Sequence, residues 1–206
     1  MCLIVFAHHA HPKYPFILLA NRDEYHERPT QQMGFWEEEL DLIGGRDLRA
    51  GGTWLAMNKS GDFAVVTNVR ASALQLNAKS RGHLPVDFLK SPQTNQSFMR
   101  GLQAQAINYN AFNLLTRKGG ALLHFNNQLG IINQVPAGIH GLCNASLNTS
   151  WPKLDQLKTL LYYHFICLTV KFLWDLELCF LMFHRYCMCH VAATYRCGWC
   201  HIDSQM

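Results

Sequence analysis

The chain has 206 residues, of which 49% are hydrophobic and 16% charged, and it carries a formal net charge of +4 at pH 7. This composition is typical of a globular domain with a sizeable core, and it excludes a disordered or low-complexity chain. The Lys and Arg residues form no dense run, so we expect no nucleic-acid partner.

The first apolar segment predicts a strand rather than a secretory signal. Residues 3–7 follow no positively charged stretch, and their apolar run stops at His8 and His9. After a turn at residues 11–15, a second apolar run covers residues 16–20. Both runs are short and continuous, which is typical of strands buried on both faces. We therefore expect a cytoplasmic protein with reduced cysteines.

The chain up to about residue 160 alternates between strand and helix patterns. The predicted elements are a loop over residues 28–47, a β-hairpin over 53–68, two helices within 83–106 that break near Ser91 and Pro92, strands over 111–116, 121–125, 129–133 and 138–144, and a helix that starts at Pro152. Most of the strands are expected to be antiparallel, with helices between them. This order predicts an α+β layered domain rather than a doubly wound one.

Cys2 is the first candidate for chemistry. Removal of Met1 would leave a thiol and a free α-amine on one residue. The reference pKa is about 8.5 for a thiol and about 7.7–8.0 for an α-amine, so the amine would act as the thiol's own base near neutral pH. This is the arrangement of an N-terminal nucleophile. The alternative is a small apolar side chain that begins a strand.

A run of polar residues, at positions 21–24, directly follows the second predicted strand. If the first two strands form a hairpin, this run returns beside Cys2. Arg22 would then favour the thiolate, and Asp23 would hold the α-amine by a charge-assisted hydrogen bond. The alternatives are an ordinary charged surface turn and a structural ion pair of Arg22 with Asp23 or Glu24.

Two asparagines are candidates for stabilising an oxyanion. Asn68 ends a predicted strand, and Asn144 ends another. A neutral amide donor suits an oxyanion hole because it stabilises developing negative charge without titrating. The alternative for each is a turn residue at the end of a strand.

Six segments occur in the order and spacing of a known family. They are Met1-Cys2-Leu3-Ile4, Leu19-Ala20-Asn21-Arg22-Asp23-Glu24-Tyr25, Arg28-Pro29, Gly51-Gly52-Thr53-Trp54, Thr67-Asn68 and residues 144–153. With them the chain resembles the NRDE family, also called the transport and Golgi organization 2 family. That family is similar to the cysteine N-terminal nucleophile hydrolases, which include choloylglycine hydrolase and penicillin V acylase. The resemblance implies an αββα four-layer sandwich.

The resemblance also implies roles for individual residues. Cys2 would be the nucleophile, Arg22 and Asp23 its neighbours, and Asn68 and Asn144 the contacts of the oxyanion or the substrate amide. The implied reaction is hydrolysis of a linear amide or acyl bond, with no cofactor and no metal. Members of the family have been linked to haem and to acyl-lipid handling. The alternative is therefore a non-catalytic protein that binds such a ligand or acts in Golgi organization and trafficking.

After about residue 161 the resemblance stops. We divide the chain into a domain over residues 1–160 and a tail over residues 161–206, which holds six of the eight cysteines. An Arg in a Gly-Thr-Arg-type context, which the family places near the nucleophile, has no counterpart here. We expect a sandwich truncated at its C-terminal end, followed by a segment whose composition a frameshift would explain.

The tail contains three other patterns. Cys197-Gly198-Trp199-Cys200-His201 matches c-type haem attachment, but that attachment normally requires export. Cys187 and Cys189 would bind zinc together with the cysteines of that motif, although Cys-x-Cys is tighter than the usual structural spacing. Residues 161–183 are long enough to span a bilayer but include charged residues, so we expect no integral membrane span.

Overall fold

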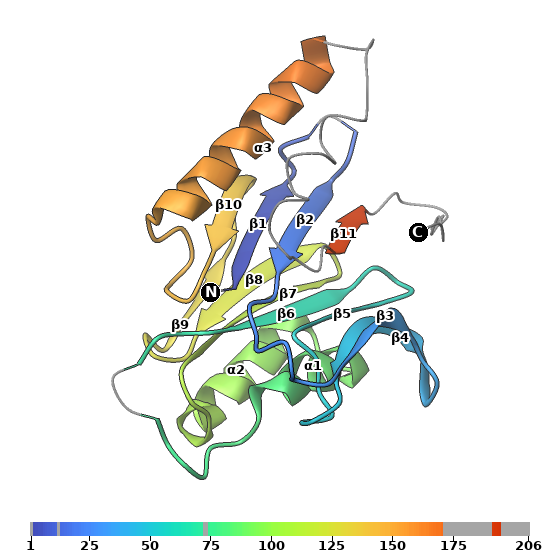
Figure 1. Ribbon diagram of the computed structural model, residues 1–206, viewed down its shortest axis with the longest axis vertical. Coiled ribbons are helices and arrows are strands. Elements are labelled where there is room, and N and C mark those ends of the chain that lie inside the picture. The colour runs from blue at the N-terminus through green and yellow to red at the C-terminus, as the bar shows by residue number, and fades with distance from the viewer. Residues whose placement is uncertain (1, 12, 72–73, 171–190, 195–206) are drawn as a thin grey trace.

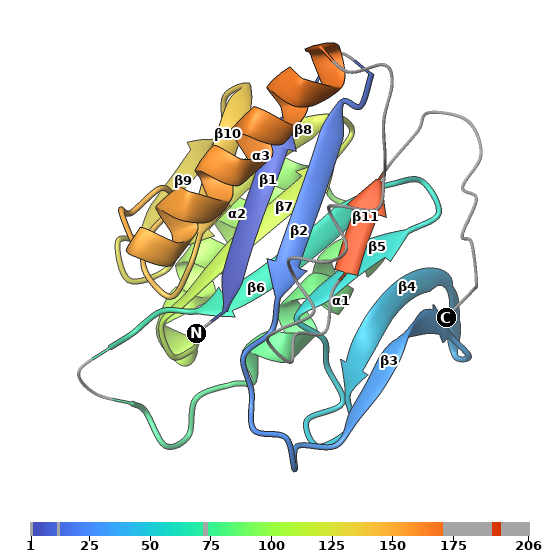
Figure 2. The same cartoon turned by 45° about the horizontal axis from the view of Figure 1, so that its top comes forward.

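Two antiparallel sheets stack on each other in the computed structural model, which describes residues 2–11, 13–71, 74–170 and 191–194. Helix α3 covers the outer face of the smaller sheet, and helices α1 and α2 cover the outer face of the larger one (Figure 1). A tilted view shows α3 lying across β1 and β10 (Figure 2). The predicted α+β class is confirmed.

The smaller sheet has the strand order β10-β1-β2-β11, and the larger sheet runs from β3 to β9 in sequence order. The strands of the smaller sheet are β1 (Leu3–His8), β2 (Phe16–Asn21), β10 (Gly138–Leu142) and β11 (Val191–Thr194). Those of the larger sheet are β3 (Thr30–Trp36), β4 (Glu39–Asp47), β5 (Leu55–Asn58), β6 (Phe63–Asn68), β7 (Phe112–Lys118), β8 (Ala121–Asn126) and β9 (Ile131–Gln134). The helices are α1 (Leu84–Lys90), α2 (Asn95–Gln105) and α3 (Pro152–Val170), with short 3-10 turns at Arg81–His83 and Ala106–Asn108.

Most predicted elements are confirmed within a few residues. The hairpin is formed by β5 and β6, and the two helical pieces are α1 and α2, which Ser91 separates. The four strands predicted between residues 111 and 144 are β7 to β10, and α3 begins at Pro152 as expected. These elements carry strong local patterns, which is why the sequence predicts them well.

Side chains of β1 alternate between two apolar layers. Ile4 and Phe6 face the larger sheet and pack in a cluster that includes Leu115. Val5, on the opposite face, packs with the α3 residue Leu161. Because both faces are covered, every residue of β1 is buried, as its continuous apolar run predicts. Strand β2 is buried on one face and only partly buried on the other.

The segment over residues 28–47 forms β3 and β4, so the predicted loop was wrong. Strand β3 lies at the edge of the sheet with mostly exposed polar residues and shows no alternating apolar pattern. The strand pair is fixed by the buried Trp36, whose Nε1 donates to the Gly44 carbonyl at 3.1 Å. Gly45 leaves room for a second ring, because a Cβ there would lie 2.5 Å from the Trp54 side chain.

Strand β11 lies in the tail, where the sequence predicted no strand. It pairs antiparallel with β2, with Val191 opposite Ala20. Among the described helices, none combines the length and the apolar character needed to cross a bilayer.

Replacing Leu115 by Ala tests the layer between the sheets. Leu115 is fully buried, so Leu115→Ala is expected to lower the free energy of unfolding by roughly 2–5 kcal/mol through lost burial and a cavity. Leu76→Ala is the matched control, because that side chain is 99% exposed and the change should stay within about 0.5 kcal/mol. Equal effects in urea denaturation would contradict the described layer.

Candidate functional site

Cys2 lies at the end of the smaller sheet, between two neighbouring strands. Leu3 pairs with Asn21 of β2, and Ile4 pairs with Leu142 of β10. Extending the β2 register by one residue puts Cys2 beside Arg22, and extending the β10 register by two residues puts it beside Asn144. The backbone N–H of Asp23 donates to Cys2 Sγ at 3.5 Å. Three of the predicted site residues are therefore neighbours of Cys2.

The Cys2 thiol is partly buried, and this controls its titration. Burial raises the pKa of Cys2, while the positive amino terminus and Arg22 act to lower it and Glu24 acts to raise it. Burial prevails, so the net direction is opposite to the effect that we assigned to Arg22 alone. A thiol with a raised pKa is protonated near neutral pH, and it becomes a nucleophile only if a base takes its proton.

The Arg22 side chain is held in place by several partners. Its guanidinium lies 4.3 Å from the centre of the Trp54 ring. It donates to Thr30 Oγ1 at 2.8 Å and to Asp47 Oδ2 at 3.3 Å, with Glu24 Oε2 at 3.8 Å. Arg22 is thus fixed as one member of an ion-pair cluster, and its charge still reaches Cys2.

Asp47 is the acceptor shared by the arginines of this cluster, and we did not predict it as a site residue from the sequence. Its Oδ2 accepts from Arg28 Nε at 2.7 Å, and its Oδ1 accepts from the backbone N–H groups of Arg49 and Ala50. Burial acts to raise the pKa of Asp47, but the hydrogen bonds from Arg28 and the backbone outweigh it and lower the pKa. The only local signal was its place after Gly44-Gly45-Arg46, in a segment that we expected to be a loop.

Asn68 and Asn144 are brought together, but not as two side chains pointing at one atom. Asn144 Nδ2 donates to the backbone carbonyl of Asn68 at 2.7 Å, while the Asn68 side chain is exposed. The backbone N–H of Arg70 donates to the Asn144 carbonyl at 3.0 Å. These bonds fix the end of β6 beside the loop that follows β10. Asn144 stays next to Cys2, with one N–H of its amide engaged by Asn68.

A buried polar network supports this loop from below. Asn113 Nδ2 donates to the Ala145 carbonyl at 2.6 Å and to the Cys143 carbonyl at 3.4 Å, and it also bonds Thr67 Oγ1 at 3.2 Å. Asn113 Oδ1 bonds His124 Nε2 at 3.0 Å and accepts from Asn126 Nδ2 at 2.9 Å. Neither Asn113 nor His124 was predicted as important, because polar residues within strands gave no family or motif signal.

The network is neutral. Burial lowers the pKa of His124 to about 4, so its ring is uncharged at neutral pH. Since Asn113 Oδ1 is an acceptor, His124 Nε2 must carry the proton, and Nδ1 is then a bare acceptor. Nδ1 is buried without a hydrogen-bond partner among the described residues.

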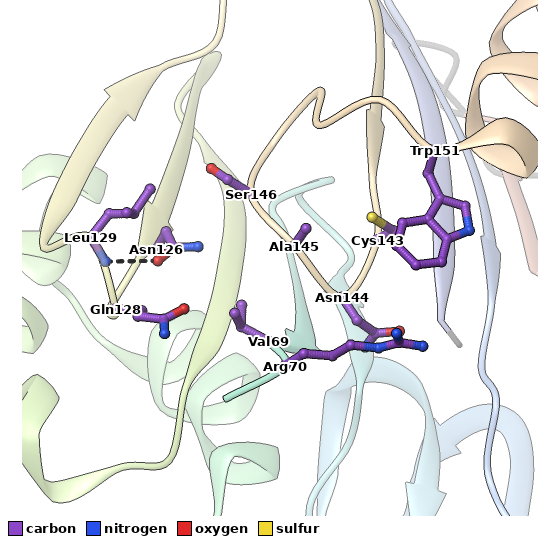
Figure 3. Close-up of a pocket in the computed structure, with 10 residues that line it drawn as sticks. All are labelled: Val69, Arg70, Asn126, Gln128, Leu129, Cys143, Asn144, Ala145, Ser146 and Trp151. Carbon is purple, nitrogen blue, oxygen red and sulfur yellow. Dashed lines mark hydrogen bonds between the residues drawn. The ribbon is translucent and has the colours of Figure 1, made fainter. Parts of the chain in front are cut away.

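A pocket of about 250 Å³ opens beside Asn144 (Figure 3). It lies between the end of β6, the β8–β9 turn and the loop from β10 to α3. Figure 3 shows the side chains of Arg70 and Asn144 extending together towards Trp151. The pocket gives the site a concave surface on the side of Asn144.

The described residues hold no group of three His, Cys, Asp or Glu side chains suited to bind a metal ion. The zinc and haem patterns at Cys187, Cys189 and residues 197–201 lie outside the described residues. Cys2 and Cys143 are both free thiols.

The family model described as Transport and Golgi organisation 2 matches residues 1–166 of the chain. The chain belongs to this family. Over 167 residues it is 35% identical to the Transport and Golgi organization protein 2 homolog of Bos taurus, covering 75% of this chain and 60% of that protein. The Homo sapiens homolog is 33% identical over 168 residues with the same shares, and the Drosophila melanogaster protein is 30% identical over 133 residues, 59% of this chain and 47% of that one.

The Transport and Golgi organisation 2 match covers every residue of the candidate site. It confirms the resemblance that the motifs around Cys2 and residues 19–25 predicted. The chain spans about 60% of the length of the first two of these relatives. Their names describe Golgi organization and transport and do not name a reaction.

Replacing Asn113 tests the buried network of this family member. Asn113→Ala removes the donor of the Ala145 carbonyl, one of the two donors of the Cys143 carbonyl and the partner of His124, so we expect a loss of roughly 2–4 kcal/mol in the free energy of unfolding. Asn133→Ala, at an exposed position of β9, is the control and should change it by less than about 0.5 kcal/mol. A small effect of Asn113→Ala in urea denaturation would contradict the network.

Asp47→Asn tests the ion-pair cluster through its pH dependence. The folded pKa of Asp47 is lowered, so its stabilising contribution is present above the unfolded pKa and is lost as the pH falls through the folded pKa. The variant should be less stable than the unmodified chain by roughly 1–3 kcal/mol at pH 7, and the difference should shrink below about pH 4. Asp41→Asn, at an exposed carboxylate, is the control. A difference that stays constant with pH would rule out a lowered pKa.

Proposed function

We propose that this chain is a cysteine hydrolase of the N-terminal nucleophile type, acting on a linear amide or acyl bond. In this proposal the two stacked sheets and their outer helices are the αββα sandwich of that class. The observation that carries the proposal is the position of Cys2, beside Arg22 and Asn144 and in contact with the Asp23 backbone. The family match over residues 1–166 supports it.

The first step would be attack of the Cys2 sulfur on the substrate carbonyl carbon. After removal of Met1, the α-amine of Cys2 would take the thiol proton. Collapse of the tetrahedral intermediate breaks the bond to the leaving group, which receives that proton. A water molecule, deprotonated by the same amine, then hydrolyses the acyl thioester and restores the thiol.

The neighbours of Cys2 would assist in distinct ways. Arg22 would lower the free energy of forming the thiolate, because its positive charge acts on the sulfur and its side chain is held by Asp47. Asp23 would hold the ammonium form of the α-amine. Asn144 and Asn68 would contact the oxyanion or the substrate amide, Asn144 through the amide proton that Asn68 does not engage.

The same proposal divides the chain at about residue 160. Residues 1–160 would form an incomplete N-terminal nucleophile domain, and residues 161–206 an aberrant tail of frameshifted origin. The end of the family match at residue 166 supports this division. Sequencing the gene across codons 155–170 tests it, because one uninterrupted reading frame would contradict the frameshift. We further propose a cytoplasmic location.

A second candidate function is non-catalytic binding of a haem or acyl-lipid ligand, or a role in Golgi organization. The raised pKa of Cys2 favours it, since a protonated thiol is a poor nucleophile. The names of the relatives, which describe Golgi organization, also favour it. In this case Cys2 would be dispensable for function.

Cys2→Ala separates the two functions. In a screen of p-nitroanilide and p-nitrophenyl esters with short to long acyl chains, Cys2→Ala should lower kcat/KM by about 10³-fold or more. Cys2→Ser, which keeps a weaker nucleophile with its α-amine, should retain part of the activity. Thermal unfolding of each variant checks that the fold is intact. A fully active Cys2→Ala would rule out the Cys2 mechanism, whereas no hydrolysis by the unmodified chain would leave the binding function.

A further inference from the structure

Three arginine side chains lie against tryptophan rings in the described part of the chain. A guanidinium that stacks on a ring keeps its in-plane N–H donors free for a carboxylate, so each stack prepares a bidentate site. The pairs and their distances from guanidinium carbon to ring centre are Arg22–Trp54 at 4.3 Å, Arg46–Trp36 at 4.6 Å and Arg70–Trp151 at 5.2 Å.

Two of these arginines already bind a carboxylate of the chain. Asp47 accepts from Arg22, and Glu38 accepts from Arg46. For Arg70, the described residues provide no carboxylate within ion-pair distance. Its guanidinium lies instead at the edge of the pocket that Figure 3 shows.

The remaining wall of that pocket suits a small amphiphilic ligand. Val69, Leu129 and Ala145 provide apolar surface. Gln128 and Ser146 lie across the pocket from Arg70 in Figure 3, and their side chains make no hydrogen bond to the described residues. The volume of about 250 Å³ is below the roughly 300–1,000 Å³ of pockets for drug-sized ligands, so the ligand should be small.

We propose that this pocket binds a small monocarboxylate with a short apolar body. The carboxylate would accept N–H bonds from Arg70, held against Trp151, as Asp47 accepts from Arg22 and Glu38 from Arg46. The apolar body would lie against Val69 and Ala145, which Figure 3 shows on the side of the pocket next to Arg70. This site does not depend on Cys2 or on a hydrolytic reaction.

The charge of the pocket selects a carboxylate over a phosphate. Arg70 is the only charged residue among the described residues that line it. One guanidinium balances a single negative charge, whereas phosphate sites in proteins combine several cations or backbone N–H groups. A dianion would therefore remain partly unpaired in this pocket.

Isothermal titration calorimetry of the full chain with hexanoate and with hexanamide tests the site. The two probes have the same apolar body and differ in charge, so hexanoate should bind about tenfold more tightly or better. Arg70→Gln should abolish this preference, and Arg70→Lys should retain part of it. Arg46→Gln is the matched control, since it removes a stacked arginine that has its own carboxylate, and it should leave the preference unchanged.

Three results with the two probes would overturn the inference. They are equal binding of the two probes, no binding of either, and a hexanoate preference that survives Arg70→Gln. Inorganic phosphate is the competing anion, and displacement of hexanoate by equimolar phosphate would also contradict it. If Arg70→Gln failed to fold, the comparison of the two probes and the Arg70→Lys variant would still show whether the pocket binds a carboxylate through Arg70. Because the readout is equilibrium binding, the Cys2→Ala variant can be used, and failure of the hydrolase proposal would leave this result unaffected.

Discussion

The side chain of Asn113 joins the two sheets at the end where Cys2 lies. It stands on β7 of the larger sheet and donates to the carbonyls of Cys143 and Ala145, which follow β10 of the smaller sheet. Without Asn113 the Ala145 carbonyl would lose its donor, and the Cys143 carbonyl would keep only the hydroxyl of Thr67. The position of Asn144, between them, therefore depends on Asn113. The pocket wall, the bond from Asn144 to the Asn68 carbonyl and the surroundings of Cys2 all follow from this one amide.

The layer between the sheets is apolar at one end and polar at the other. At one end it is filled by apolar side chains such as Phe16, Phe63 and Leu122, which provide most of the burial. Towards the start of β1 it becomes polar, with Asn113 and His124 in a neutral hydrogen-bonded network. A neutral, rigid environment raises the pKa of a nearby thiol and holds donors in place. Such an environment suits either a nucleophile that needs its own base or a pocket that binds without reacting.

Local patterns in the sequence were enough to predict the two core strands, the β5–β6 hairpin, the three helices and the return of Arg22 beside Cys2. Contacts between distant segments were not predictable. Strands β3 and β4 carry polar and glycine residues, and their pairing depends on Trp36. Asp47 lies 25 residues from Arg22 along the chain, and its role appears only when these strands form. The Asn113 network was also missed, because a polar residue in a strand predicts an exposed face unless its partners are known.

The identity of the amino-terminal residue in the folded protein decides whether Cys2 can act as an N-terminal nucleophile. An N-terminal nucleophile needs a free α-amine on Cys2 itself, because that amine is the base for a thiol whose pKa burial raises. Mass spectrometry of the N-terminal peptide, from protein expressed without an N-terminal tag, reads this in one spectrum. The N-terminal nucleophile proposal predicts a peptide that lacks Met1 and begins with Cys2 carrying an unmodified amine. A peptide that retains Met1, or that carries an acetyl group on Cys2, would contradict it.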